Sequence, residues 1–233
     1  MKYKLPRQVL KQDIKDLIHR ELAKQGFPAE KATNKKLKEI SEVLSVIQEK
    51  GMPDHLVLKK LSGELGYGIF LHPNAKPLKK GQVIAPYAGV VTLTPQNDAD
   101  DSSYAFSTLS DILLNKNEQL LLDKTIKFAP RRLYCLNLDA DKEGNFTRFI
   151  NHSTDKPNVE ALLISVSKNN FGLEQMPIEV LYVAKKTIQP GEQLLVCYED
   201  EEESYWGAIG IEPYPMDPKT FTIDQNLNLV KSK

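Results

Sequence analysis

The chain has 233 residues, of which 41% are apolar and 27% charged, with equal numbers of Lys/Arg and Asp/Glu. This length suits one large domain, or one domain with a helical extension, and the composition is that of a soluble globular protein. No apolar stretch approaches the ~20 residues that span a bilayer, and no signal-peptide pattern opens the chain, so we expect an intracellular protein with no membrane partner. The two cysteines, Cys135 and Cys197, are too few for a metal cluster and suggest no disulfide framework.

Charge is unevenly distributed along the chain. Residues 1–60 contain 14 Lys/Arg against 8 Asp/Glu, which leaves 17 against 23 for the remainder. Two acidic runs, 98–101 and 199–203, lie in that remainder. Such runs are usually solvated loops, and the alternative is an acidic rim that attracts a basic partner.

The first 53 residues are predicted to form an N-terminal helical extension. Apolar residues recur there at helical spacing in two stretches, which end at Gly26 and Gly51. The two apolar stripes are Leu10, Ile14, Leu17 and Ile18, and Leu37, Ile40, Leu44 and Ile47. Two such helices would form an α-helical hairpin that packs on the main domain, or on a second subunit in a homodimer, and the alternative is a substrate-binding role.

After Pro53 the pattern changes to that of β-structure. Short apolar runs rich in β-branched or aromatic residues are separated by clusters of Gly, Pro, Asn and Asp, as expected for many short strands. The runs are HLVLKKL (55–61), YGIFL (67–71), QVIAPYAGVVTL (82–93), YAFSTL (104–109), QLLLD (119–123), RLYCLNLDA (132–140), EALLISV (160–166), IEVLYVAKKTI (178–188) and EQLLVCYE (192–199). The fold class is therefore mainly β, in small sheets with substantial loops.

Four stretches combine into a specific pattern. They are GELGYGIF (63–70), APYAGVV (85–91), GNFTRFINHSTDKPN (144–158) and IQPGEQLLVCYED (188–200). Each alone is weak, because turn glycines or a hydrogen-bonded Asn-His turn would explain it. In this order, with YVAKKTI just before PGEQLLVCY, they resemble the SET-domain protein-lysine methyltransferases from about Leu56 to Trp206.

The resemblance implies a SET-domain (β-clip) fold of several small antiparallel sheets. A pseudoknot-like crossing would bring the segment that ends at Tyr198 past the segment that carries Asn151 and His152. The chain would then divide into an extension (1–53), a SET domain (54–200) and a C-terminal segment (201–233) that closes the active site.

The resemblance also implies S-adenosylmethionine as the cofactor. Glycines on both sides of Tyr67 would let the backbone approach it, and the ring of Trp206 would cover the adenine or the lysine stem, unless that ring only packs. For Tyr104 the alternative is a strand residue in the core. By their position in the family, the cofactor-binding residues are Gly66, Tyr67, Gly68, Tyr104, Arg148, Asn151, His152 and Trp206.

Two tyrosines match the family's catalytic positions. Tyr198 would lie beside the transferring methyl group and Tyr87 would line the lysine channel, and the alternative is that both are buried strand aromatics. Val196 and Ala161 match substrate-binding positions where an aromatic hydroxyl usually limits the number of methyl groups. Because both are small, the resemblance implies room for a di- or trimethylated product.

No metal site and no catalytic base are expected. Thr154 stands where many relatives have a zinc-binding cysteine, and no cysteine follows Cys197. A free lysine amine has a pKa of about 10.4, which a nearby positive charge and an apolar channel would both lower. Proton loss to solvent is then sufficient.

The expected function is transfer of methyl groups from S-adenosylmethionine to a lysine of a protein, such as a histone or histone-like basic tail, in a chromatin-regulating role. The alternatives are a methyltransferase of a non-histone protein and an inactive SET-like protein-binding module. No direct nucleic-acid partner is expected, because the basic surplus is modest and aromatics are sparse in the N-terminal helices. The expected location is cytoplasmic or nuclear, and a microbial effector acting in a host nucleus is an alternative.

Overall fold

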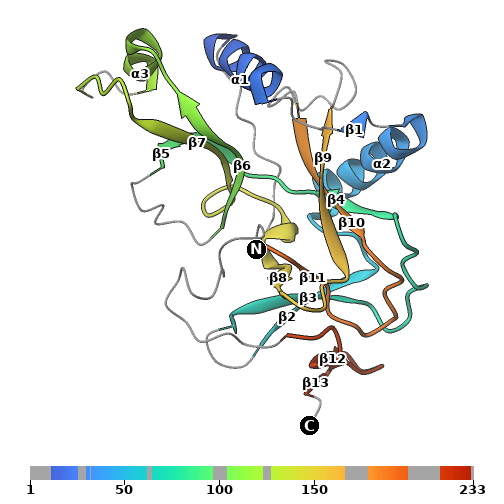
Figure 1. The fold of residues 1–233 in the computed structure, drawn as a ribbon. Coiled ribbons are helices and arrows are strands. Elements are labelled where there is room, and N and C mark those ends of the chain that lie inside the picture. Colours follow the sequence, from blue (N-terminus) through green and yellow to red (C-terminus); the bar gives the residue numbers. More distant parts are fainter. Residues whose placement is uncertain are drawn as a thin grey trace.

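Two lobes of β-structure make up the computed structural model (Figure 1). The structure describes residues 12–25, 30–31, 33–61, 65–96, 104–122, 127–165, 178–198 and 216–231. The first lobe is the antiparallel sheet β5–β7–β6, formed by Val90–Pro95, Leu133–Asp139 and Ala105–Leu113. We call it the three-stranded lobe.

The second lobe contains a six-stranded sheet. Its main path is β4–β10–β9–β11–β8, with β1 added to β9. The strands are β4 (Val83–Pro86), β10 (Ile178–Ala184), β9 (Val159–Ser165), β11 (Leu195–Val196), β8 (Asn151–His152) and β1 (Glu30–Lys31). Two separate two-stranded sheets pair β2 (Leu56–Lys60) with β3 (Tyr67–Leu71), and β12 (Phe221–Ile223) with β13 (Leu229–Lys231). Many short strands in small sheets are therefore confirmed.

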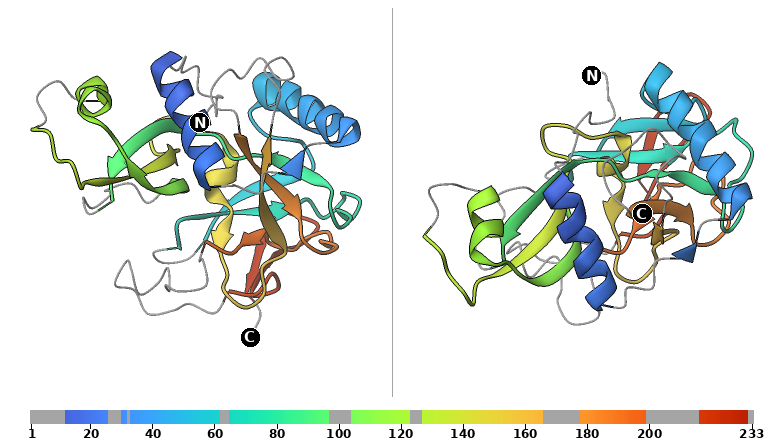
Figure 2. Two further views of the ribbon diagram at one scale, coloured as in Figure 1. Left: turned by 45° about the horizontal axis from the view of Figure 1, so that its top comes forward. Right: turned by 90° about the horizontal axis from the view of Figure 1, so that it is seen from above.

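The two predicted N-terminal helices are α1 (Gln12–Gln25) and α2 (Asn34–Lys50). Thr33 caps the start of α2 by accepting a hydrogen bond from the backbone of Lys36, and Gly51 ends it with a φ of 84°. The helices lie apart, since α2 packs on β4 whereas α1 lies beside the three-stranded lobe (Figures 1 and 2). The strand β1 separates them and pairs with β9.

The apolar stripes of both helices are buried in the main core of the protein itself. The buried members are Leu17, Ile18, Ile40, Leu44 and Ile47, and they belong to the same cluster as the inner residues of both lobes. The packing role is thus the one observed for the described part of the extension. A homodimer through these helices would need other surfaces.

Strand prediction was wrong over 119–122 of the run 119–123, because the chain forms the helix α3 (Lys116–Leu122) there, and residue 123 lies outside the described residues. The side chain of Asn115 accepts hydrogen bonds from the backbone of Asn117 and Glu118, and the Glu118 carboxylate accepts one from the backbone of Asn115. This reciprocal arrangement is a capping box. Straight-chain and leucine side chains follow it, and they favour a helix once its first turn is capped.

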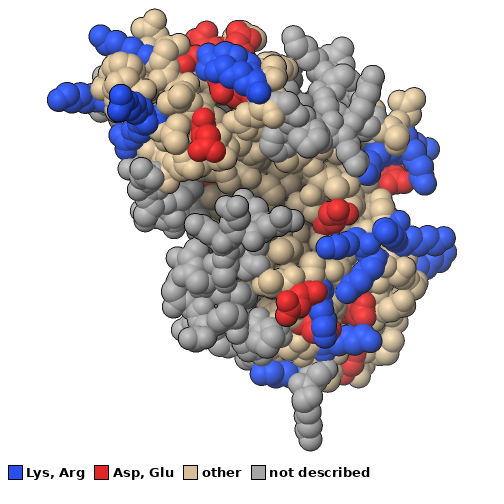
Figure 3. Space-filling view, viewed as in Figure 1, with Lys and Arg blue, Asp and Glu red and all other residues tan. Residues whose placement is uncertain are grey.

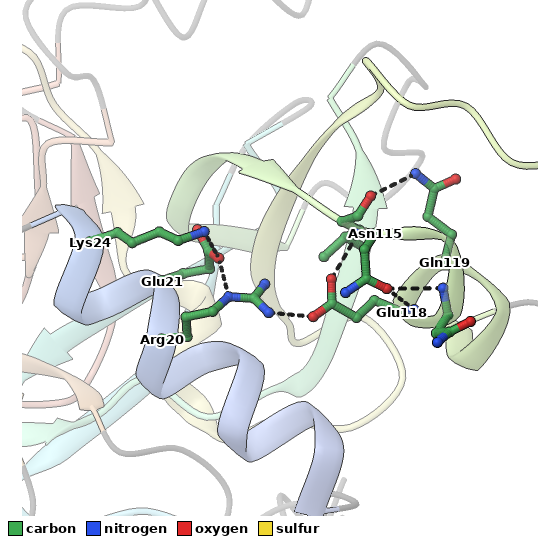
Figure 4. Close-up of polar contacts among 8 residues, drawn as sticks. Arg20, Glu21, Lys24, Asn115, Glu118 and Gln119 are labelled. Carbon is green, nitrogen blue, oxygen red and sulfur yellow. Dashed lines mark hydrogen bonds and ion pairs between the residues drawn. The ribbon is translucent and has the colours of Figure 1, made fainter.

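Side chains of α1 reach across to the three-stranded lobe (Figure 4). Arg20 forms an ion pair with Glu118 of α3, and it also contacts its neighbour Glu21. The side chain of Gln25 donates a hydrogen bond to the carbonyl oxygen of Ser110 on β6 (2.8 Å). Residues almost a hundred positions apart in sequence thereby fix α1 to this lobe.

Charged side chains on the face drawn in Figure 3 are mixed in sign. Described Lys and Arg residues gather at the upper left, over the three-stranded lobe, and along the right edge, with acidic residues among them. The acidic runs 98–101 and 199–203 lie outside the described residues. No helix in the described part of the chain combines the length and apolarity needed to cross a membrane.

Candidate active site

The strand pair β8–β11 shows how Asn151 and His152 are placed in the fold. These strands run parallel, so the backbone that leads to Tyr198 passes directly beside His152. The backbone N–H of Tyr198 donates to Nδ1 of His152 (3.0 Å), and Nε2 of His152 lies 3.0 Å from the hydroxyl oxygen of Thr154. Because Nδ1 accepts, the neutral ring carries its proton on Nε2 and donates it to Thr154.

The hydroxyl of Tyr198 is also held. It donates to the carbonyl oxygen of Ile150, and the rings of Tyr198 and His152 lie 5.3 Å apart. A phenol oxygen that donates its only proton still has lone pairs to offer. The predicted meeting of the two segments is therefore confirmed, and it leaves the Tyr198 oxygen able to accept.

Asn151 connects this crossing to strand β3. Its side-chain amide donates to the carbonyl oxygen of Tyr67 (2.9 Å). Tyr67 is 44% exposed, and its ring meets that of Phe149 edge-on with the ring centres 5.8 Å apart. An exposed ring beside a polar wall is a surface on which a flat ligand can stack.

The two glycines beside Tyr67 have different surroundings. Gly66 has a φ of +64°, and no described residue lies within 4 Å of the position that a Cβ would take. At Gly68 that position lies 2.6 Å from the side-chain nitrogen of Gln193. The sequence predicted that the cofactor comes close to the backbone at both glycines. At Gly68 the buried side chain of Gln193 fills that space, so only Gly66 has room for a ligand.

Arg148 and Tyr104 form a second wall. The Arg148 guanidinium donates to the carbonyl oxygens of Ala140 and Asp141 (2.7 Å to the latter). Its central carbon lies 5.1 Å from the ring centre of Tyr104 and 4.8 Å from that of Phe149. The Nε atom of Arg148 is buried and has no partner among the described residues. Arg148 therefore shapes the wall through its stacking and keeps one donor unused.

Three aromatic residues from three different strands or strand ends meet at the junction of the lobes. Tyr87 follows β4, Phe106 lies on β6 and Tyr182 lies on β10. The ring centres are 5.6 Å apart for Tyr87 and Phe106, and 5.7 Å apart for Tyr87 and Tyr182. The ring centres of Phe106 and Tyr182 are 6.5 Å apart. We call Tyr87, Phe106 and Tyr182 the aromatic cluster.

Two of these three residues were missed by the sequence reasoning. Phe106 lies in the apolar run 104–109 and Tyr182 in the run 178–188. The sequence pattern indicated a strand at each place but no role for either side chain. A weak signal existed for Phe106, which lies two positions after Tyr104 and so shares its face of a strand. Nothing local marks Tyr182, because its place in the cluster depends on how β10 pairs with β4 and β9.

Small residues lie next to the cluster on the six-stranded sheet. Ala161 on β9 is the direct cross-strand partner of Tyr182 on β10. Val196 on β11 pairs with Val159 of β9 and with His152 of β8. Directly paired residues share a face of a sheet, so Ala161, Val196 and Tyr182 point to the same side.

Two buried asparagines also hold the site, and the sequence reasoning gave them no role. Asn145 caps the short helix η2 (Phe146–Phe149), and its side chain donates to the carbonyl oxygen of Pro86 (2.8 Å), one residue before Tyr87. Asn158 donates to the carbonyl oxygen of Gln193 and accepts from the N–H of Leu195, both at 2.8 Å. An asparagine can satisfy a donor and an acceptor at once, which is what the crossing requires.

These walls suit a ligand with a flat aromatic part and a polar part. The residues Tyr67 and Tyr198 are 44% and 36% exposed, and they flank Asn151, His152 and the space beside Gly66. The residues present thus fit a nucleoside cofactor. Trp206 lies outside the described residues, so its predicted covering role stays a prediction. Among the described residues, no three His, Cys, Asp or Glu side chains group as a metal site, and the expectation of no metal stays an expectation as well.

Comparison with known proteins identifies the family. The SET domain model matches residues 66–199, which is more than half of the chain. Comparison with curated proteins finds no significant match. The chain belongs to the SET-domain family, and this membership supports a methyltransferase activity.

Two solved structures of ATXR5 show the same fold. ATXR5 in complex with monomethylated histone H3.1 has a TM-score of 0.57 at 18% identity, covering 88% of this chain and 84% of its own. The ATXR5 SET domain with dimethylated histone H3 has a TM-score of 0.51 at 23% identity, covering 76% and 72%. KRYPTONITE with DNA, an H3 peptide and SAH has a TM-score of 0.42 at 22% identity, covering 72% and 28%.

Proposed function

We propose that this protein is an S-adenosylmethionine-dependent protein-lysine N-methyltransferase. The observation that carries the proposal is the position of Tyr198, which is fixed by His152 and Ile150 at the crossing. Membership of the SET-domain family supports the same reaction.

The cofactor would be held by the exposed face of Tyr67 and by the wall that Asn151 and His152 form. Bound there, S-adenosylmethionine supplies an activated methyl group that a neutral amine can take by direct displacement. Tyr104 and Arg148 would close the side of the site through their stacked arrangement.

The aromatic cluster would form the channel for the substrate lysine. Aromatic rings pack against the aliphatic stem of a lysine and exclude water around it. An apolar surrounding lowers the pKa of the amine, so the lysine loses its proton to solvent without a dedicated base. The channel therefore both places the amine and prepares it for attack.

Tyr198 would align the reacting groups. Its hydroxyl proton points to the Ile150 carbonyl, so its lone pairs can receive weak C–H···O contacts from a methyl group or an N–H from the amine. Enzymes gain much of their rate from such positioning. Val196 and Ala161 would bound the same space with small side chains.

We infer that the substrate is a protein, and that a basic segment such as a histone tail suits it best. The structural neighbours ATXR5 and KRYPTONITE are described with histone H3 or an H3 peptide. The chain itself contributes the acidic runs 98–101 and 199–203, the second of which begins directly after Tyr198. Such charges would favour a basic partner over a neutral one.

The test is methyl transfer from labelled S-adenosylmethionine to purified histones and to a cell protein extract. Tyr198→Phe should lower the rate about 100-fold, the size expected when reacting groups lose their positioning. Tyr134→Phe is the matched control, because Tyr134 is a buried tyrosine on β7 outside the aromatic cluster. It should transfer methyl groups at the wild-type rate.

The outcomes separate the hypotheses. Label on lysine in wild type and its loss in Tyr198→Phe would support the proposal and name the substrate class. Equal label in wild type and Tyr198→Phe would contradict the role of Tyr198. Cofactor binding without transfer to either pool would indicate a substrate outside both pools, and absence of both binding and transfer would favour the alternative of a protein-binding module.

A further inference from the structure

Exposed lysines gather on two neighbouring turns of the second lobe. One turn lies in the connection from β3 to β4 and the other in the connection from β10 to β11 (Figure 1). All of these lysines are exposed, and none of them forms an ion pair with another described residue. They are Lys76, Lys79, Lys80, Lys185 and Lys186, and we call them the lysine patch.

Backbone hydrogen bonds hold the two turns side by side. The N–H of Gly81 donates to the carbonyl oxygen of Ala184 (2.7 Å), and the N–H of Ala184 donates to that of Gln82 (3.0 Å). Leu78 and Ile188 exchange two further bonds, of 3.1 and 3.0 Å. The lysines of both turns therefore belong to one surface, whose backbone is fixed before any ligand arrives.

Acidic residues close to the patch offset only part of its charge. Glu160 lies on β9 opposite Val183 of β10. The carboxylate of Glu192 accepts a hydrogen bond from a backbone N–H (2.8 Å), and Asp217 forms an ion pair with Lys156 (2.9 Å). The patch thus keeps an excess of positive charge, which attracts a polyanion although the whole chain has no net charge.

We propose that the lysine patch binds the phosphate backbone of duplex DNA. An ammonium group contacts phosphate as a point charge and reads no base, so binding should be independent of sequence. The exposed aromatic residues of the described chain are Tyr67, Phe128 and Tyr198, and none of them lies on the two turns. Proteins hold single strands by stacking bases on such rings, so a patch without rings favours a duplex.

A membrane surface is less well matched to the same lysines. Interfacial binding combines basic residues with apolar side chains that enter the lipid. No large apolar side chain is exposed on the described residues of the two turns. The expected absence of a nucleic-acid partner rested on the N-terminal helices, and the lysine patch lies outside them.

The patch adjoins the scaffold of the active site without sharing its proposed binding residues. The N–H of Lys185 donates to the carbonyl oxygen of Asn158 (2.9 Å), whose side chain holds the segment that leads to Tyr198. DNA binding is therefore a property beyond the proposed methyl transfer, and it can be measured without S-adenosylmethionine.

The test is anisotropy of a fluorescently labelled DNA duplex, titrated with protein between about 50 and 200 mM NaCl. Wild type should bind with a Kd of about 1–100 μM, in the range of sequence-independent binding. With one phosphate for each lysine, log K should fall against log [NaCl] with a slope of about −4.5. Absence of binding, or a slope near zero, would overturn the proposal.

Two double variants locate the contact. Lys79→Gln/Lys80→Gln and Lys185→Gln/Lys186→Gln each remove two charges from one turn, so each slope should become less steep by about 2. Exposed lysines without ion pairs add little to stability, so the unfolding temperature should stay at its wild-type value. Slopes equal to that of wild type would show that DNA binds elsewhere and would overturn the proposal.

Lys116→Gln/Lys127→Gln is the matched control. It removes the same charge from two exposed lysines beside α3, in the basic group over the three-stranded lobe (Figure 3). This variant should keep the wild-type slope. A reduction equal to that of the patch variants would mean that net charge, and not the lysine patch, attracts DNA.

Two further probes distinguish the source of the phosphate. A single strand of the same length and vesicles rich in phosphatidylserine should both bind more weakly than the duplex at equal salt. Tighter binding of the single strand, or binding of vesicles without binding of the duplex, would overturn the proposal. Since no measurement involves methyl transfer, failure of the proposed function would leave these results unchanged.

Discussion

Glu179 is a carboxyl group on β10 that the proposed reaction does not use. It is only 9% exposed, and burial raises its pKa from the ordinary value of 4.5 to about 8. The folded protein therefore holds a proton that the unfolded chain releases above about pH 4.5. The contribution of Glu179 to folding stability should therefore be greatest below that pH and should decline as the pH rises toward 8.

Replacing Glu179 with glutamine should remove this decline. The wild-type free energy of unfolding is expected to fall between pH 5 and pH 8 by at most about 3.5 kcal/mol more than that of Glu179→Gln. Urea unfolding of both proteins at pH 5, 6, 7 and 8 measures the difference. If the free energies of unfolding of the two proteins change with pH in parallel, the Glu179 carboxyl group is hydrated or hydrogen-bonded in solution, and its pKa is not raised.

Individual site residues could be predicted where a motif carries them. Asn151, His152 and Tyr198 were expected to meet, and they do, because the order of the motifs specifies the crossing. Tyr182 and Asn158 could not be found in this way. Their roles depend on strand register and on partners more than twenty positions away, which no local pattern reports.

At the scale of elements, the contact between α1 and α3 offers a direct test. Arg20 and Glu118 are both partly shielded from solvent, and their ion pair joins the N-terminal extension to the three-stranded lobe. A double-mutant cycle with Arg20→Gln and Glu118→Gln should give a coupling energy of about 0.5–1 kcal/mol, the upper range for pairs near a surface. Thermal or urea unfolding of the four proteins measures it.

The pair Lys35–Glu39 on α2 is the matched control. Its charged atoms are 3.9 Å apart, and Lys35 is almost fully exposed. The same cycle there should give a coupling energy near zero, because water screens both charges. Equal couplings at the two pairs would show that α1 gains nothing specific from Glu118.

Prediction of elements succeeded where the signal is local and long enough. The helix α2 ends where Gly51 predicts, α1 is helical over the described residues Gln12–Gln25, and the runs at 56–60 and 67–71 are strands. It failed for α3, because an apolar run of five residues fits either state and the capping residues Asn115 and Glu118 were not weighed. The separation of α1 from α2 was also invisible, since it depends on β1 pairing with β9.

At the scale of the whole molecule, the end of the described chain returns to the active site. The Ser153 hydroxyl, one residue after His152, donates to the carbonyl oxygen of Met216. Met216, Phe221 and Ile223 are buried in a second apolar cluster with residues of β2, β3 and β11. Residues 216–231 thus pack against the crossing and stabilise it. The sequence pattern did not reveal this role, because it depends on contacts that exist only in the complete fold.

A chain ending at residue 215 should therefore be unable to maintain the site. It would expose the partners of the second cluster, and each large apolar side chain that loses burial costs about 1.5–3 kcal/mol. The side chains left behind are Leu61, Phe70 and Leu195. The combined loss approaches the whole stability of an ordinary domain, so circular dichroism should show a lost or strongly lowered unfolding transition. Binding of S-adenosylmethionine, measured by calorimetry, should disappear with it.

A longer truncation product distinguishes support of the crossing from a general effect of shortening. A chain ending at Asp224 keeps Met216, Phe221 and Ile223 but lacks β13, two of whose three residues are exposed. It also keeps the backbone bond from Ile223 to Gly191 (3.0 Å), which anchors β12 beside the segment leading to Tyr198. This chain should fold and bind the cofactor, because the buried contacts and the Ser153 bond remain. If it behaves like the chain ending at 215, the stabilising contacts belong to the β12–β13 pair instead of the cluster beneath the crossing.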